Sequence, residues 1–133
     1  MEQMSRSQAR MKAFELIFMI DSCESVEFEL DILSKELKEH KKHVKYIKKV
    51  VNTVMEHKDE IDEMISENLG KGWSFRRLSK MSVAVLRLAV AEIKYMEDIP
   101  VSVSVNEAVE LAKKYGEDSE PVFINGVLGV IAK

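Results

Sequence analysis

Apolar residues recur at helical spacing along most of the chain. Three successive stretches of the first half, within residues 9–20, 26–37 and 44–54, place them three or four positions apart. This spacing predicts three amphipathic helices, the last of which can continue through residues 61–65. Glycines at positions 70 and 72 then stop helix propagation and supply a turn, which is the best internal boundary in the chain.

The chain after this turn has a denser apolar pattern. The segment SFRRLSK (74–80) predicts a single helical turn. The segment MSVAVLRLAVAEIKYM (81–96) has so many apolar positions that it predicts a central helix packed on more than one side. After Pro100, VSVSV alternates as a strand would, whereas the pattern from Asn106 to a C-cap at Gly116 is helical.

A last helix is predicted near the C-terminus. Ser119 is a suitable N-cap and Pro121 suits the first turn. Gly126 and Gly129 weaken the interior of this helix, and glycines at such spacing usually permit close helix packing. The complete pattern predicts an all-α protein.

Length and composition indicate a single globular domain over residues 1–133, with helical halves of about 1–70 and 71–133. Charged residues make up 32% and hydrophobic residues 46% of the chain, which argues against disorder and against a membrane span. The lone Cys23 cannot form an intramolecular disulfide, and the charged N-terminus lacks the apolar segment of a signal peptide. We therefore expect a cytoplasmic protein without membrane association.

Charge is distributed unevenly along the chain, although its net value is only −3. The stretch KEHKKHVKYIKK (38–49) holds six lysines against one glutamate, while EHKDEIDEMISE (56–67) is strongly acidic. A partner meets such patches rather than the average charge. The lysine stretch favours a solvated helix surface, with nucleic-acid contact as the alternative.

Catalytic chemistry has little support in the sequence. His40 and His43 could share a helix face and a metal, but no cysteine lies nearby and lysines separate them, so a metal site is not predicted. Carboxylates occur in runs typical of helix surfaces, and the segment NLGKGW lacks the spacing of phosphate-binding loops. We predict a protein that is not an enzyme and that has no cofactor.

Binding has better support, at the start of the first helix. The segment SRSQARMKAF (5–14) contains two arginines, one lysine and no acid. On a helical wheel Arg6 and Arg10 lie one turn apart beside the apolar stripe, so both could reach one groove of a partner. Arginine suits phosphate because its planar fork donates two parallel hydrogen bonds. The alternative interpretation is a frayed, solubilising terminus.

Several stretches together resemble the NusB family of transcription antitermination factors. They are SRSQARMKAFELIF, Trp73 with RRL at 76–78, VLRLAVAEI, IPVSVSVNEAVELAKKYG and FINGVLGVI, in matching order across nearly the whole chain. The resemblance implies two helical bundles packed side by side, with about seven helices. It further implies pairing with the ribosomal protein NusE and binding of a boxA RNA element. The resemblance thus implies a role in an antitermination complex on RNA polymerase, notably in ribosomal RNA synthesis.

The same resemblance implies which residues bind RNA. The basic N-terminal region of the family corresponds to Arg6, Ser7, Arg10 and Lys12, and it is thinner here than an unbroken arginine run. Phe123 matches an aromatic residue of the family at a loop-to-helix junction near RNA and partner, although an aromatic residue there is often simply packed.

For NusE, the resemblance points to three positions. Phe18 corresponds to an aromatic residue near the NusE surface, with burial in the core as the alternative. Ser82 stands where the family often has an acidic residue, and Ser119 lies in a loop that commonly ends in a basic residue.

Other matched residues are expected to have structural roles. Polar side chains on apolar helices need hydrogen-bond partners when they are buried, and Trp73 is expected to seal the junction of the bundles. The polar residues of this kind are Arg87, Glu92, Asn106, Glu107 and Asn125.

Two alternatives to a standalone antitermination factor stay open. One is an RNA-targeting module of a ribosomal RNA methyltransferase, which would need a large cofactor-binding domain after the helices. The other is a helical oligomer that does not bind RNA. A homodimer is also possible, and it could bury the basic end of the first helix.

Overall fold

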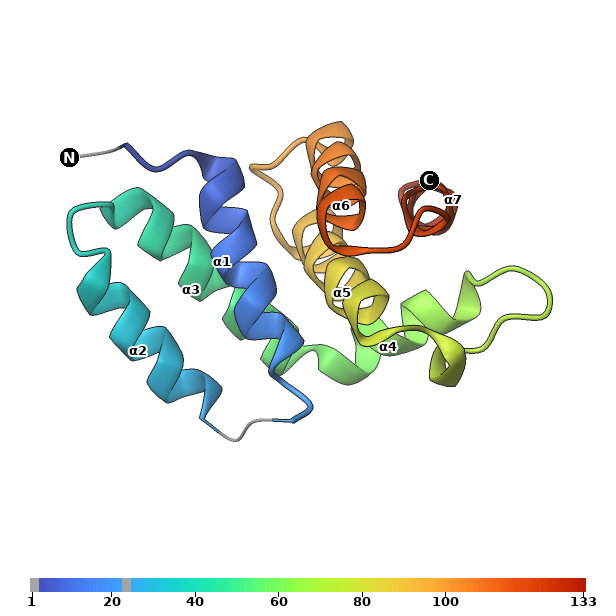
Figure 1. Ribbon diagram of the computed structural model, residues 1–133, viewed down its shortest axis with the longest axis horizontal. Coiled ribbons are helices and arrows are strands. Elements are labelled where there is room, and N and C mark those ends of the chain that lie inside the picture. The colour runs from blue at the N-terminus through green and yellow to red at the C-terminus, as the bar shows by residue number, and fades with distance from the viewer. Residues whose placement is uncertain (1–2, 23–24) are drawn as a thin grey trace.

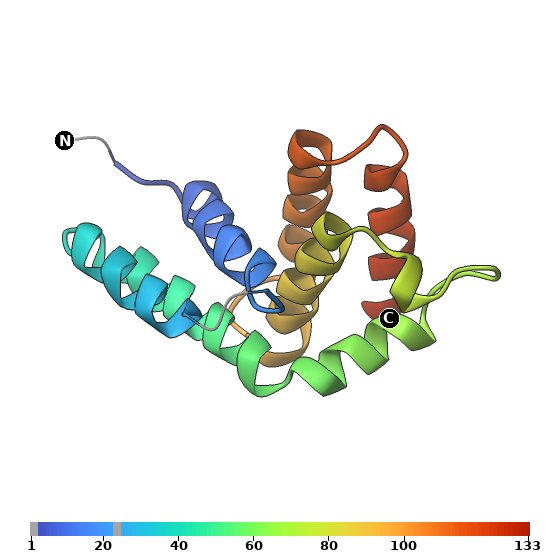
Figure 2. The same cartoon turned by 60° about the horizontal axis from the view of Figure 1, so that its bottom comes forward.

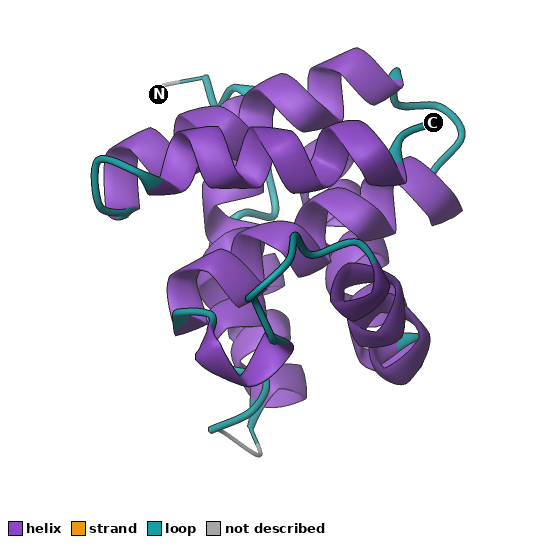
Figure 3. Cartoon of the chain, turned by 90° about the vertical axis from the view of Figure 1, so that its right-hand side faces the viewer, coloured by secondary structure: helices purple, strands orange, loops and turns teal. Residues whose placement is uncertain are grey.

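The computed structural model describes residues 3–22 and 25–133, so Cys23 lies outside the described residues. In this part of the chain the regular structure is entirely helical, as predicted, and short loops join the helices (Figure 3). None of these helices is both long and apolar enough to cross a membrane. The described residues form seven α-helices, α1 (Arg6–Phe18), α2 (Val26–Glu36), α3 (Lys41–Glu56), α4 (Lys58–Glu67), α5 (Lys80–Tyr95), α6 (Val101–Tyr115) and α7 (Glu120–Ile131), with a 3-10 turn η1 (Phe75–Arg77) before α5.

The helices form two bundles that lie side by side. Helices α1, α2 and α3 make up one bundle, and α5, α6 and α7 the core of the other (Figure 1). Helix α4 continues from α3 beneath the second bundle, as Figure 2 shows, and it packs against α5, α7 and η1. The chain therefore passes from one bundle to the other at His57, before the glycine turn.

The third predicted helix does not continue without a break. Helix α3 ends at Glu56, α4 begins at Lys58, and His57 between them has non-helical angles (φ −112°, ψ 23°). The break redirects the chain so that the fully buried Ile61 and Ile65 belong to a helix that packs on α5. Spacing alone does not reveal it, because the apolar period is similar on both sides.

Helix α5 is the central element of the fold, as its apolar pattern predicts. It contacts α1, α3, α4, α6 and α7, and all of its residues from Ala84 to Glu92 are buried. Its N-cap is Ser79, whose Oγ accepts the N–H of Ser82 at 3.0 Å. The core of both bundles is assembled around this helix.

Helix α6 starts earlier than the alternating pattern suggests. It begins at Val101 and includes all of VSVSV, so the strand-like interpretation of this stretch is wrong. The buried positions Ser104, Ala108 and Leu111 follow the helical period, whereas Val101 and Val103 are exposed. The helix ends at the predicted C-cap, Gly116.

The glycines of α7 do not have the close-packing role that their spacing predicts. A Cβ on Gly126 or Gly129 would meet no atom within 4 Å, so these glycines do not mediate close helix packing. Gly116 is the tight position instead, because a Cβ there would lie 2.8 Å from the carbonyl oxygen of Ala112 and 2.4 Å from Cε of Met81. The α6–α7 connection thus depends on the absence of a side chain at Gly116.

Candidate nucleic-acid interface

The first helix begins with a complete capping box and an uncompensated positive charge. The N–H of Gln8 donates to Ser5 Oγ at 3.1 Å, and the N–H of Ser5 donates to Gln8 Oε1 at 2.8 Å. The first turn contains Arg6 and no acidic residue. Since a helix N-terminus already carries partial positive charge, Arg6 destabilises the helix slightly here, and the combination suits an anionic partner.

Arg6 is held over an aromatic ring of α3. Its guanidinium carbon lies 4.4 Å from the ring centroid of Tyr46, which is buried, while Arg6 itself is exposed. No ion-pair partner of Arg6 occurs among residues 3–22 and 25–133. The guanidinium is therefore positioned by the ring and open to a ligand.

Arg10 is buried at the junction of the two bundles, with an exposed fraction of 3%. Its Nε and Nη2 donate to the two carboxylate oxygens of Glu92 at 2.7 and 3.1 Å, and its Nη1 donates to Glu107 at 3.0 Å. The prediction that Arg6 and Arg10 reach one groove of a partner does not match this structure. Glu92, which the helical wheel of α1 does not include, draws Arg10 inward.

The charge of Arg10 is stable in this environment. Burial by itself lowers the pKa of Arg10, but the hydrogen bond with Glu92 and the neighbouring negative charges outweigh it, so the pKa is raised. Burial and then the charge of Glu92 raise the pKa of Tyr46. Both side chains keep their protons at all pH values at which the protein would function.

Glu92 is the centre of a fully satisfied buried network. One carboxylate oxygen accepts from Arg10 and the hydroxyl of Tyr46, and the other accepts from Arg10 and the hydroxyl of Ser104 at 2.7 Å. These side chains come from α1, α3, α5 and α6. The network confirms that Glu92 and Glu107 have structural partners, and it sets the position of α1 between the bundles.

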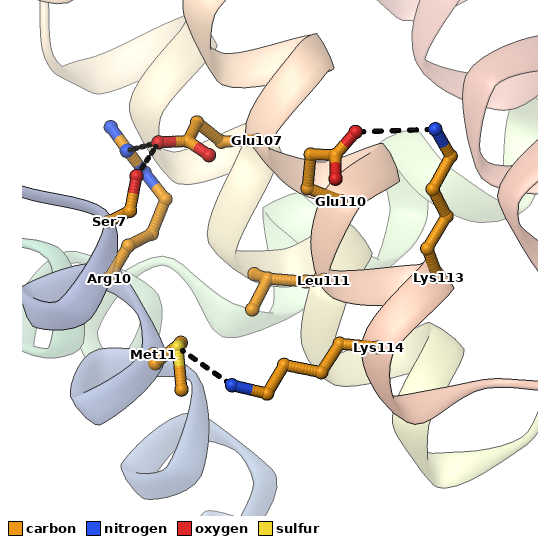
Figure 4. Close-up of a pocket in the computed structure, with 8 residues that line it drawn as sticks. All are labelled: Ser7, Arg10, Met11, Glu107, Glu110, Leu111, Lys113 and Lys114. Carbon is orange, nitrogen blue, oxygen red and sulfur yellow. Dashed lines mark hydrogen bonds and ion pairs between the residues drawn. The ribbon is translucent and has the colours of Figure 1, made fainter.

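A hollow of about 350 Å³ separates α1 from α6 beside this network. Ser7 donates to Glu107 at its rim, so the exposed Ser7 is tied to the same carboxylate as Arg10 (Figure 4). Lys114 extends across the hollow and its Nζ lies 3.5 Å from Sδ of Met11. Lys12 is exposed further along α1, next to a second hollow near His40.

Phe18 lies at the other end of α1, at the edge of a hollow of about 390 Å³. It is 43% exposed, so the structure does not bury it in the core. Phe75, Arg76 and Leu78 from the segment before α5 line the same hollow. The site is a partly apolar surface with cationic groups at its rim.

Arg87 also lines this hollow, and two carboxylates hold it in place. Its Nε and Nη2 donate to the carboxylate oxygens of Asp62 at 2.8 and 2.7 Å, and its Nη1 donates to Asp21 at 2.9 Å. Burial alone would raise the pKa of Asp21, but hydrogen bonds from Lys58 and Arg87 lower it. The expected structural role of Arg87 is confirmed, with partners from α4 and from the segment after α1.

Ser82 and Ser119, the other two residues assigned to NusE, lie in different settings. Ser82 is buried, with 3% of its surface exposed, and its hydroxyl donates to Glu120 at 3.3 Å. It therefore links the start of α5 to the start of α7. Ser119 is exposed, its backbone is helical (φ −85°, ψ −15°), and its side chain does not cap α7.

Phe123 is half-buried, and it packs against both the hydrophobic core and the ring of Trp73. Their ring centroids are 5.0 Å apart, and Arg77 lies 5.9 Å from the Trp73 ring. Trp73 is 51% exposed, so the prediction that it seals the junction is wrong. Asn106 and Asn125 are also exposed and need no buried partner. Together Trp73 and Phe123 form an aromatic surface beside α7.

Sequence reasoning did not identify Tyr46 as part of the site. The residue occurs within the lysine stretch 38–49, where charge dominates the pattern. Its signal is the helical spacing that it shares with Val50, which marks it as core-facing. The described residues contain no cluster of three or more His, Cys, Asp or Glu side chains placed to hold a metal ion.

This architecture defines a small all-α protein with two bundles and a cationic helix start at their junction. The profile of the NusB family matches residues 7–133. The transcription antitermination protein NusB of Bacillus subtilis is 43% identical over 133 residues, covering 96% of this chain and 95% of the relative.

Solved structures give the same result. The NusB structure from T. maritima superposes with a TM-score of 0.84 at 33% identity, covering 98% of this chain and 92% of that one. A crystal structure of antitermination factors NusB and NusE in complex with dsRNA superposes with a TM-score of 0.78 at 32% identity, covering 96% and 95%. The chain belongs to the NusB family.

Proposed function

We propose that the protein is a non-enzymatic transcription antitermination factor that binds a boxA-type RNA together with NusE. It would act in the cytoplasm within an RNA polymerase complex during ribosomal RNA transcription. The observation that carries the proposal is the cationic start of α1, where Arg6 is exposed, has no described ion-pair partner and is held over Tyr46. The similarity to a NusB structure in complex with NusE and dsRNA supports RNA as the anionic partner.

The RNA surface divides into contacting and positioning residues. Arg6, Ser7 and Lys12 are exposed on α1 and would contact phosphates. Arg10 would act through the buried network, because its guanidinium is already engaged by two carboxylates. We therefore assign Arg10 as a positioning residue for the helix start.

The NusE surface is proposed to lie around the hollow beside Phe18. An exposed aromatic ring next to a partly apolar hollow is a typical anchor for a protein partner. Ser82 would support this surface only indirectly through Glu120, whereas Ser119 is accessible for contact. Phe123 lies on the aromatic surface with Trp73, where RNA bases could stack.

Removing the exposed cations should weaken RNA binding without unfolding the protein. For Arg6→Ala with Lys12→Ala, we expect about a tenfold loss of RNA affinity and a shallower salt dependence, because fewer counterions are released. Thermal unfolding should change little, since both side chains are exposed. Titrations at several salt concentrations measure the first effect and circular dichroism the second. A lower melting temperature with unchanged RNA affinity would reassign these residues to stability.

Sequence selectivity is expected to depend on the pair. The α1 start offers mainly phosphate contacts, which distinguish sequences poorly. NusE should therefore raise the affinity for boxA RNA far more than for a scrambled RNA of equal length. Phe123→Ala should reduce this gain and leave the weak background, and Val130→Ala, an exposed position further along α7, serves as the control.

Titrations of both RNAs with and without NusE, at one salt concentration, test this prediction. Equal gains for the two RNAs would leave a generic electrostatic binder and contradict the proposed function. If the protein retains no RNA even with NusE, the alternative of a helical oligomer that does not bind RNA is favoured. Size-exclusion chromatography of the protein alone would then report its oligomeric state.

A further inference from the structure

The solvent side of α3 and the turn that precedes it carry a cluster of exposed lysines, here called the lysine face. It consists of Lys38, Lys41, Lys42, Lys45, Lys48 and Lys49, all exposed. None of the six has an ion-pair partner within the described part of the chain, whereas Lys35, Lys58 and Lys113 elsewhere each contact a carboxylate. On a chain of net charge −3, this is a local reversal of sign.

The arrangement of these lysines works against the stability of the helix. Lys41 and Lys42 occupy the first turn of α3, which contains no acidic residue and where the helix dipole is already positive. Lys45 lies four residues from both Lys41 and Lys49, and like charges at this spacing destabilise a helix. An anionic ligand on the lysine face would relieve both penalties.

The lysine face is continuous with the proposed RNA site. Tyr46, on which Arg6 is held, is buried, but it neighbours the exposed Lys42 and Lys49 along α3, at spacings of four and three residues. On the opposite side, Lys41, Lys45 and Lys48 line a hollow of about 400 Å³ with Ser34 and Val44, between α2 and α3. Cationic side chains therefore extend from the α1 start around α3 to this hollow.

The chemistry of the face favours a phosphate backbone over base recognition. Lysine is a flexible point charge without the planar fork of arginine, and Tyr46, the one Phe, Tyr or Trp residue of α3, is buried. Lys41 and Lys48 are separated by about 10 Å along the helix axis, which gives room for contacts to more than one phosphate. Such contacts bind nucleic acid irrespective of sequence.

We infer that the lysine face of α3 binds the phosphate backbone of RNA flanking the boxA element, as an extension of the α1 site. The inference rests on the proposed function for its RNA and adds a second surface to it. Helices α2 and α3 lie at the edge of the molecule away from α6 and α7, so flanking RNA can follow this edge without crossing the second bundle (Figure 1).

The test compares two triple variants with equal charge change. Lys41→Gln, Lys45→Gln and Lys48→Gln remove the part of the lysine face at the hollow. Lys71→Gln, Lys94→Gln and Lys133→Gln remove exposed lysines of the second half as the matched control. Each protein is titrated, with NusE, against boxA RNA alone, boxA RNA extended by uridines at both ends, and a scrambled RNA of the extended length.

The lysine-face variant should bind boxA RNA alone as the wild type does and lose about tenfold affinity for both extended RNAs. Its slope of log affinity against log salt for extended RNA should become shallower by about 2, because each lost phosphate contact contributes about 0.7 on a single strand. The control variant should keep the wild-type slope, and unfolding curves of all three proteins establish that they are folded.

Equal affinities and slopes for the two triple variants would overturn the inference. So would a loss of binding to phosphatidylglycerol vesicles by the lysine-face variant while its extended-RNA slope stays unchanged, which would assign the face to a membrane surface. If the wild type prefers boxA no more than scrambled RNA, the proposed function fails. In that case the lysine face is tested by the extended scrambled RNA alone: the lysine-face variant should still lose affinity for it, and the control variant should not.

Discussion

Arg10→Ala should lower the free energy of unfolding by about 3 to 5 kcal/mol, one of the two largest effects expected for this protein. The substitution leaves the carboxylate of Glu92, which is 1% exposed, buried without its cation. Breaking a buried ion pair from one side is costly for this reason. Chemical denaturation followed by circular dichroism measures the change.

Arg6→Ala is the matched control, because Arg6 lies one turn earlier on the same helix and is exposed. It should change the unfolding free energy by no more than about 0.5 kcal/mol. The double variant Arg10→Met with Glu92→Leu should recover part of the loss, since it removes both buried charges. The buried network would be contradicted if Arg10→Ala were as stable as the wild type. It would also be contradicted if the loss in the double variant equalled the sum of the losses in the two single variants.

Leu88→Ala should destabilise the protein by about 2 to 5 kcal/mol. Leu88 is 2% exposed on α5, the helix that contacts five others, so neighbouring side chains have little freedom to fill the space. The cost combines lost burial with the cavity left behind. Denaturant unfolding of the wild type and the variant, fitted with the same dependence of unfolding free energy on denaturant concentration, gives the difference in stability.

The control for this substitution is Val122→Ala, at a position of α7 that is 77% exposed. Its effect should stay within about 0.5 kcal/mol. A loss below about 1 kcal/mol for Leu88→Ala would show that the centre of α5 is not a tightly packed core.

The fold could be predicted well where apolar positions are dense along a helix. The density of apolar positions in 81–96 predicts that α5 is central, and the structure confirms it. The start of α6 was harder, because Val101 and Val103 alternate with Ser102 and Ser104 as in a strand. What selects the helix is tertiary: Ser104 must face Glu92 on α5, and that contact is invisible in local spacing.

The candidate site shows the same limit. Arg6 and Arg10 are equivalent by residue type and by helical wheel, so the sequence places both at the surface. Only Glu92 and Glu107, far away in the chain, decide that Arg10 is buried while Arg6 is exposed. Trp73, expected at the bundle junction, is 51% exposed, whereas Ser82, expected at the NusE surface, is 3% exposed.

The buried network also determines when the protein can become functional during its synthesis. Arg10 leaves the ribosome early, but its partners Glu92 and Glu107 belong to the last third of the chain. Until they emerge, the guanidinium has no buried partner, and α1 has no reason to settle between the bundles. The nascent chain therefore completes the proposed RNA-binding end only after α6 has been made, although that end is synthesised first.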